Sequence, residues 1–332
     1  MSAATTALLV GAAVLGVGVP WFGIRMIAPT LRSSEGAHAT NFHGRPVFYG
    51  LGIVWLLWAG CAVIGGVAFA SLASNTVLPI LTLAGPLALV AFALGFIDDT
   101  YGSDAARGFK GHLTAMFRGQ LTTGGMKLVG IGLASLVVAV MMGQVSPWGS
   151  FAQAGGFSAV IRGGAILLAG ASVALTSNLF NLLDLRPGRA LKAYGLLIPV
   201  AVVSAAVGLG HGPGVEWLGV RGIGPVAFDA AALLLFLIGP MAAVWRFDLG
   251  EVGMLGDAGA NPMGATIGLL IISGLPLWGL IVWTLFVLAA NLASERVSFS
   301  AVIAKNALLR RIDGLGRLEE DATPRDDKGA RF

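Results

Sequence analysis

The sequence contains few charged residues, and this scarcity determines its class. Only 11% of its 332 residues are Asp, Glu, Lys or Arg, whereas 56% are hydrophobic and the mean hydropathy is +0.83. Soluble domains of this length do not have such a balance, so we expect a polytopic membrane protein. Cysteine is nearly absent. The one cysteine, Cys61, lies in an apolar run, which excludes an intrachain disulfide and favours a packing role.

Histidine is also scarce, and several catalytic patterns are missing. The four histidines are His38, His43, His112 and His211. The sequence has no His/Cys cluster with metal-ligand spacing, no Ser-His-Asp arrangement, no Walker loop and no GxGxxG before a helix. These absences argue against a zinc site, a serine hydrolase, a P-loop NTPase and a dinucleotide-binding domain. Nothing indicates a nucleic-acid partner.

Apolar runs of about 17–25 residues, the length that crosses a bilayer, recur along the chain. The first of them has no Lys or Arg before it, unlike a secretory signal peptide, so we expect it to be retained. We therefore predict an all-α helix bundle with about nine or ten transmembrane helices. The runs are 6–24, 47–70, 77–97, 126–145, 163–183, 190–209, 226–245, 260–274 and 275–293.

The basic residues predict the orientation of these spans. All 21 Lys and Arg residues except Arg162 and Arg221 fall in or beside alternate loops and the C-terminal tail. Loops rich in Lys and Arg face the cytoplasm, so we expect an outside N-terminus and a cytoplasmic C-terminus in a plasma membrane.

The chain divides into three parts. Residues 1–293 form the transmembrane domain. In 294–318, apolar residues at helical spacing alternate with arginines, which predicts either an amphipathic helix on the cytoplasmic membrane surface or a helix that caps the bundle. Residues 319–332 are polar and predicted to be disordered.

Aspartates stand where three of the apolar runs end or begin. They are Asp98 and Asp99 in GFIDDTYG, Asp184 in NLFNLLDLRPGR and Asp257 in MLGDAGANPMG. A carboxylate costs roughly 2.5–3.5 kcal/mol at the centre of a span, and it remains unfavourable at the edge of the hydrocarbon. Three such motifs at one face of the membrane therefore predict a charged site. Mg2+ and phosphate suit a site of this kind.

Two of these motifs also have a simpler explanation. The carboxylates of Asp98 and Asp99 would repel each other when desolvated, which a cation or a proton relieves, but they could equally be solvated loop residues. Asp257 could cap a helix instead of binding a metal.

The third motif is a polar stripe. Asn178, Asn181 and Asp184 recur every three residues and so share one side of a helix, facing a polar cavity or a neighbouring helix. Arg186 and Arg189 follow directly. They suit phosphate binding, although basic loops also arise from topology alone.

Together, the DD pair, the NxxNxxD stripe and the (M/L)GDxG turn occur in this order between about Asn41 and Asn291. In this they resemble the polyprenyl-phosphate sugar-1-phosphate transferases (glycosyltransferase family 4). This family includes phospho-MurNAc-pentapeptide transferase and GlcNAc-1-phosphate transferases of cell-wall glycan synthesis. The resemblance implies a cytoplasmic active site, a Mg2+ cofactor, and transfer of a sugar-1-phosphate from a UDP-sugar to polyprenyl phosphate with release of UMP. The resemblance is also compatible with a homodimer.

The resemblance also implies roles for individual residues. Asp98 and Asp99 would lie at the phosphates, where one deprotonates the lipid phosphate, and Asp257 would bind the metal. Asp184 would be catalytic and line the nucleotide-diphosphate site with Asn178 and Asn181. Lys127 matches a lysine of the family, and we expect Arg186 and Arg189 to contribute to substrate binding.

The sequence departs from the family pattern in two ways. Pro187 stands where a second Asp is usual, and no histidine follows His211, so the HxHH-type motif of the family is missing. A catalytically silent member that binds the lipid or a partner therefore remains an alternative, as does a membrane transporter. A CDP-alcohol phosphotransferase would need several aspartates in one helix-spaced motif, which the sequence lacks.

Overall fold

Helices make up most of the chain described by the computed structural model, which covers residues 2–34, 38–41, 43–72, 78–102, 108–151, 158–209 and 223–317. Within these residues, seven helical segments are long and apolar enough to cross a membrane. The chain is therefore a helical, multi-pass membrane protein, as its composition predicts. The predicted disordered tail, 319–332, lies outside the described residues, as do His211 and Arg221.

Each of the nine predicted apolar runs coincides with a helical segment. In order these are the continuous helix α1 (Ala3–Ala12), η1 (Ala13–Gly18) and α2 (Val19–Ser33); α3 (Ile53–Ala68); η3 (Leu78–Ile80) with α4 (Leu81–Tyr101); α6 (Thr123–Met142); α8 (Ser158–Leu183); α9 (Arg189–Leu209); α10 (Ile223–Leu249); α11 (Asp257–Gly274); and α12 (Leu277–Ser294). Shorter helices are α5 (Gly108–Phe117), α7 (Pro147–Phe151), α13 (Phe299–Lys305) and α14 (Ala307–Gly314). The seven candidate spans omit α3, which is shorter, and α11.

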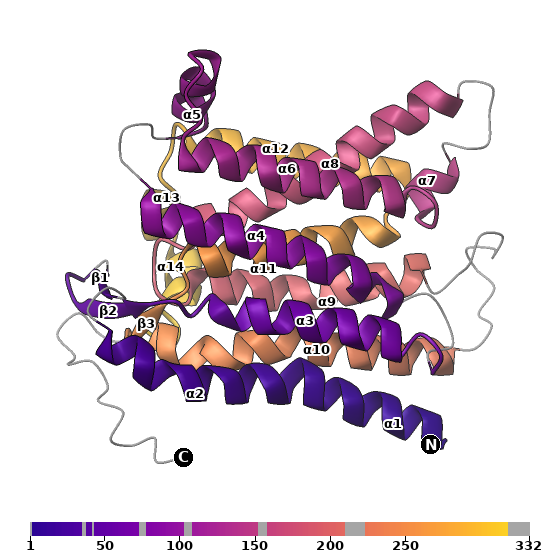
Figure 1. Ribbon diagram of the computed structural model, residues 1–332. Helices are drawn as coiled ribbons and strands as arrows, with labels where there is room; N and C mark the ends of the chain where they lie inside the picture. The colour runs from indigo at the N-terminus through magenta and orange to yellow at the C-terminus, as the bar shows by residue number, and fades with distance from the viewer. Residues whose placement is uncertain are drawn as a thin grey trace.

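The innermost helix is α11. Every residue from Ala258 to Gly274 is buried, and the helix packs against α3, α4, α8 and α9 (Figure 1). Asp257 and Asn261 make its first turns polar, so protein rather than lipid must surround it. This central helix carries Asp257 to one end of the bundle.

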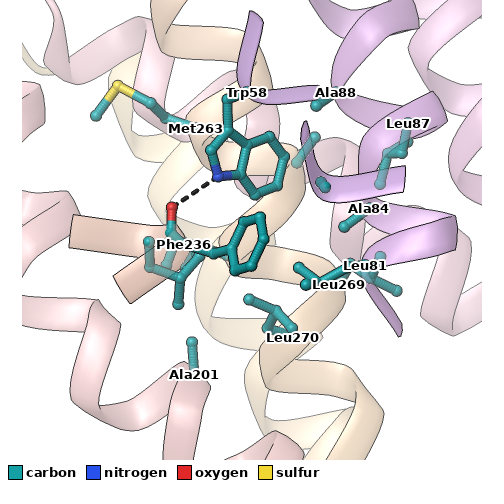
Figure 2. Close-up of a cluster of buried hydrophobic side chains, with 14 of the residues drawn as sticks. Trp58, Leu81, Ala84, Leu87, Ala88, Ala201, Phe236, Met263, Leu269 and Leu270 are labelled. Carbon is teal, nitrogen blue, oxygen red and sulfur yellow. Dashed lines mark hydrogen bonds between the residues drawn. The ribbon is translucent and has the colours of Figure 1, made fainter. Parts of the chain in front are cut away.

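Two buried tryptophans donate hydrogen bonds to backbone carbonyls that have no donor within their own helix. Pro240 in α10 has no N–H, so the carbonyl of Phe236, four residues earlier, loses its helical hydrogen bond. Trp58 Nε1 of α3 donates to this carbonyl at 2.6 Å, inside the apolar cluster drawn in Figure 2. Trp148 Nε1 donates at 3.0 Å to the carbonyl of Ile272, which also lies four residues before a proline. Both hydrogen bonds join neighbouring elements, and each gives a partner to a backbone carbonyl that would otherwise be unsatisfied in the apolar core.

A small sheet corrects the all-α prediction in one detail. β1 (His38–Thr40) pairs antiparallel with β2 (Pro46–Tyr49), and β2 pairs in parallel with β3 (Gly253–Met254). The run 47–70 is therefore helical only from Ile53 onwards. Strands of two to four residues are too short to show the alternation of side chains that identifies a strand.

Glu251 anchors this sheet. Its φ of 52° is rare for a residue other than glycine, and its side chain is fully buried. The carboxylate accepts hydrogen bonds from Asn41 Nδ2 at 2.8 Å, His43 Nδ1 at 2.8 Å and Arg45 Nη1 at 3.1 Å. These contacts tie the connection between α2 and α3 to the segment that leads into α11.

Candidate active site

Four helix ends meet at one end of the bundle. α4 ends, α6 begins, α8 ends and α11 begins on the left of Figure 1, at the end opposite the start of α1. The three aspartate motifs, which are far apart in the sequence, therefore become neighbours. The predicted site residues at these ends are Asp98, Asp99, Lys127, Asn178, Asn181, Asp184 and Asp257.

Lys127 links two of the motifs. Its side chain is 11% exposed, and Nζ lies 2.7 Å from Asp98 Oδ2. The same ammonium group pairs with Asp257 Oδ2. Thr123, one turn earlier on α6, hydrogen-bonds to Asp98. Because an unpaired buried charge is strongly unfavourable, Lys127 holds the carboxylates of α4 and α11 together.

Asn181 completes this cluster from α8. Its amide lies between Asp257 and Lys127. In the orientation that satisfies both amide groups, the NH2 donates to Asp257 and Oδ1 accepts from Lys127 Nζ at 3.0 Å. Side chains from four helices thus converge within hydrogen-bonding distance of one another.

Asp99 has different partners from Asp98, although the two are adjacent. Its Oδ1 accepts from the backbone N–H of Asp257 at 3.0 Å, and its Oδ2 accepts from that of Ala258 at 2.9 Å. These donors have no partner within α11, so Asp99 caps that helix from α4. The Tyr49 hydroxyl also hydrogen-bonds to Asp99. Asp99 therefore fixes the direction in which Asp257 points.

Two glycines allow these elements to approach so closely. At Gly95 in α4, an added Cβ would lie 2.3 Å from the carbonyl oxygen of Asp257. Gly256 has a φ of +64°, and a Cβ there would lie 2.6 Å from Asp99 Oδ2. Both the close approach and the backbone conformation require glycine at position 256.

Asp184 lies just beyond the last turn of α8, close to the start of α11. Burial raises the pKa of Asp184 well above its usual value, and the charges of Asp248, Asp257 and Asp99 raise it further. The N–H of Gly256 hydrogen-bonds to the same carboxyl and opposes part of this shift. The neighbouring carboxylates thus favour the protonated form of Asp184.

The polar residues on α8 face two different environments, and both were predicted from the sequence. Asn181 joins the cluster around Lys127, whereas Asn178 donates to Asn291 Oδ1 on α12 at 2.7 Å. Asn291 in turn donates to the carbonyls of Leu175 and Val287. Asn178 therefore makes the helix–helix contact that was the alternative to a polar cavity.

The basic loop after α8 is held by the C-terminal segment. Arg189 is 6% exposed, and its Nε donates to Asp313 Oδ1 of α14 at 2.8 Å. Lys192 Nζ donates to the carbonyl of Asp313 at 2.5 Å, and Arg317 Nε donates to the carbonyl of Pro187 at 2.9 Å. α14 and Arg317 thus cap this end of the bundle, and Arg189 serves as the anchor of α14. Arg186 is partly buried in the same loop.

Mg2+ prefers oxygen ligands, and the carboxylates at this end of the bundle can supply them. Among the described residues, no three His, Cys, Asp or Glu side chains form a metal cage. Mg2+ rarely needs one, because it binds through one or two carboxylates together with phosphate and water. Asp257 and Asp98 offer such carboxylates, and a divalent cation would offset the repulsion between them. The carboxylates of Asp98 and Asp257 therefore fit Mg2+.

Several residues at this end were not predicted from the sequence. Asp248 accepts from the N–H of Gly188 at 2.6 Å and so holds the turn after Asp184. The scarcity of acidic residues in the chain could have identified Asp248. Tyr49 and Asn291 carry no sequence pattern that distinguishes them from other residues.

The comparisons with known proteins add no family. No family model matches the chain, and no curated protein matches its sequence. The resemblance to the sugar-1-phosphate transferases therefore stays a prediction from the three motifs, and function is argued from the site.

Proposed function

We propose that this protein transfers a sugar-1-phosphate from a UDP-sugar to polyprenyl phosphate in a Mg2+-dependent reaction that releases UMP. The observation that carries the proposal is the convergence of Asp98, Asp257 and Asn181, one residue from each of the three motifs, around Lys127 at one end of a membrane bundle. Both substrates are anionic, so a site with a cation and a lysine is needed to offset their repulsion. A position at the ends of the spans suits one lipid substrate and one soluble substrate.

The proposed reaction is a phosphoryl substitution. An oxygen of the lipid phosphate forms a bond to the phosphorus that carries the sugar. The bond from this phosphorus to the bridging oxygen breaks, and that oxygen leaves with the electron pair as part of UMP. Bound Mg2+ would neutralise the phosphate oxygens on which charge accumulates.

The residues of the chain then have separate roles in the proposal. One carboxylate of the pair Asp98 and Asp99 accepts the proton of a monoprotonated lipid phosphate; Asp98 is paired with Lys127, and Asp99 caps α11. Asp257 holds the metal, and Lys127 supplies a second positive charge. Asn181 and Asp184 line the nucleotide-diphosphate site.

The topology belongs to the same proposal. Counting α3 and α11 as crossing helices gives nine spans, with the N-terminus outside and the C-terminus in the cytoplasm. The site then lies on the cytoplasmic face of the plasma membrane, and the product serves cell-envelope glycan synthesis.

A catalytically silent member of the family is the second candidate. It is favoured by the absence of a histidine after His211 and by the pairing of Lys127 with the predicted metal ligand, Asp257. A transporter is disfavoured, because these carboxylates gather at helix ends and not at mid-span.

UMP release tests the proposal directly. The purified full chain is incubated with undecaprenyl phosphate, Mg2+ and, in turn, each of several UDP-sugars. We expect release with one donor and a loss of at least about 100-fold in Asp257→Asn, because removing a group that stabilises developing charge has effects of this size. Glu295→Gln, which alters an exposed carboxylate after α12, is the matched control and should retain activity.

The opposite result is equally informative. Folded protein that releases no UMP with any donor would exclude the transferase with these substrates and favour the silent candidate. Activity that survives Asp257→Asn would show that the metal ligand is misassigned.

A further inference from the structure

The helix α14 has two faces of different character. Arg310 and Asp313 lie on one face, and Arg317 follows the end of the helix; Asp313 and Arg317 bind the loop between α8 and α9. The opposite face carries the aliphatic side chains of Leu308 and Ile312, which are 66% and 36% exposed, and Leu315 follows at the C-cap with 58% exposed. The polar face is used to attach the helix to the bundle, and the aliphatic face points outwards.

The position of α14 explains why an aliphatic face can point outwards. Through its polar face and the residues that follow it, the helix contacts Pro187 and Arg189, where α8 ends and α9 begins, and it approaches Leu249 at the end of α10 through Gly316. It therefore lies at the level at which three spans end. In a membrane protein, this level is the boundary between the acyl chains and the headgroups.

Basic residues flank the aliphatic face. Arg311 is exposed and lies about 100° round the helix from Ile312, and exposed Lys305 ends α13 just before it. Apolar side chains that enter the acyl boundary, bordered by Lys and Arg at headgroup level, are the features by which helices bind acidic bilayers.

We propose that the outward face of α14 is a binding surface for acidic phospholipids, with Leu308, Ile312 and Leu315 in the acyl boundary and Arg311 and Lys305 at the headgroups. The occupant is the bilayer itself, because the face lies level with the span ends and its border is positively charged. Since α14 also holds Arg189 through Asp313, the bilayer braces the loop that follows Asp184. This surface does not depend on the proposed catalytic activity.

Site-directed spin labelling tests the proposal in the full chain. Leu308→Cys and Leu315→Cys are made singly in a Cys61→Ala background, which removes the one native cysteine. The labelled protein is placed in nanodiscs of phosphatidylcholine, alone or mixed with phosphatidylglycerol. Collision rates with oxygen, which partitions into lipid, and with a water-soluble nickel chelate report the depth of each label. Leu285→Cys on α12, 59% exposed, is the lipid-facing standard.

We expect both labels on α14 to favour oxygen over the chelate by at least about twofold in the acidic nanodiscs, and less so in phosphatidylcholine alone. Arg311→Glu should reduce the difference between the two lipids. Labels that favour the chelate would show a water-exposed face and overturn the proposal. Labels shielded from both reagents would show a protein partner or a second copy, and equal depth in both lipids would refute the role of acidic headgroups.

Discussion

Gly256 occupies the position where Tyr49, Asp99 and the start of α11 meet. A Cβ at this residue would lie 2.6 Å from Asp99 Oδ2 and 2.7 Å from Tyr49 Cε1, on a backbone with φ of +64°. We expect Gly256→Ala to lower the free energy of unfolding by about 1–3 kcal/mol, because both the overlap and the backbone conformation oppose it. Titration with a denaturing detergent measures this quantity.

Gly132 supplies the control for this experiment. It lies in α6, and nothing stands within 4 Å of a Cβ added there. Gly132→Ala should be neutral or stabilising by up to about 1 kcal/mol, because alanine favours helices. Equal effects of the two substitutions would contradict the assigned role of Gly256.

Trp58 of α3 donates a hydrogen bond to the backbone of α10. Trp58→Phe removes the donor that satisfies the Phe236 carbonyl, and a buried carbonyl without a partner costs about 1–3 kcal/mol. The free energy of unfolding should fall by this amount. Trp283→Phe should cost less, because the buried Nε1 of Trp283 has no hydrogen-bond partner among the described residues.

The two adjacent aspartates show how far single residues can be interpreted from sequence. The cost of burying charge identifies Asp98 and Asp99 as unusual, and the structure does place both beside Asp257. Their different partners could not be predicted, because these depend on where α11 crosses α4. The same reason separates Asn181 from Asn178, whose partner Asn291 lies on a helix far along the chain.

The attachment of α14 to the bundle depends on the negative charge of Asp313. Burial alone would raise the pKa of this carboxyl, but hydrogen bonds from Arg189 and the charges of Arg317, Arg189 and Lys192 lower it below 3.8. A lowered folded pKa means that the stabilisation is complete above the ordinary value and is lost as the pH falls through the folded value.

We therefore expect α14 to detach only below about pH 4, the ordinary value for an aspartate. A spin label at Leu308→Cys should be immobile at neutral pH and become mobile in this acidic range. Asp313→Asn should give a mobile label at every pH, whereas a label at Leu285→Cys should not respond. A Leu308 label whose mobility is the same across this range in the otherwise native chain would argue against the ion pairs.

Helices and strands could be predicted where the signal lies within one continuous stretch of sequence. Long apolar runs identify all nine helical segments, because a helix satisfies its own backbone hydrogen bonds within one stretch of sequence. The sheet could not be predicted, because β2 and β3 are brought together only by the folded bundle. Between α12 and Arg317 the chain forms α13 and α14, and the break between them at Asn306 was not predicted from the sequence.

For the whole molecule, the positive-inside pattern gives a testable topology. Gln120 precedes α6 and Gln144 follows it, and both side chains are exposed. In a Cys61→Ala background, a membrane-impermeant maleimide should label Gln144→Cys in intact cells and Gln120→Cys only in inside-out vesicles. The reverse pattern would place the candidate site outside the cell.

The enclosure of α11 also has a consequence for how the protein is made. Synthesis runs from the N-terminus, so α4, α6 and α8 reach the membrane long before the helix that they surround. Until α11 emerges, Asp99 has no helix to cap, and neither Lys127 nor Asn181 has Asp257 as a partner. A chain whose translation stops after α10 therefore fills much of the membrane volume of the finished protein but has no site. The cluster of Asp99, Lys127, Asn181 and Asp257 therefore forms only near the end of synthesis.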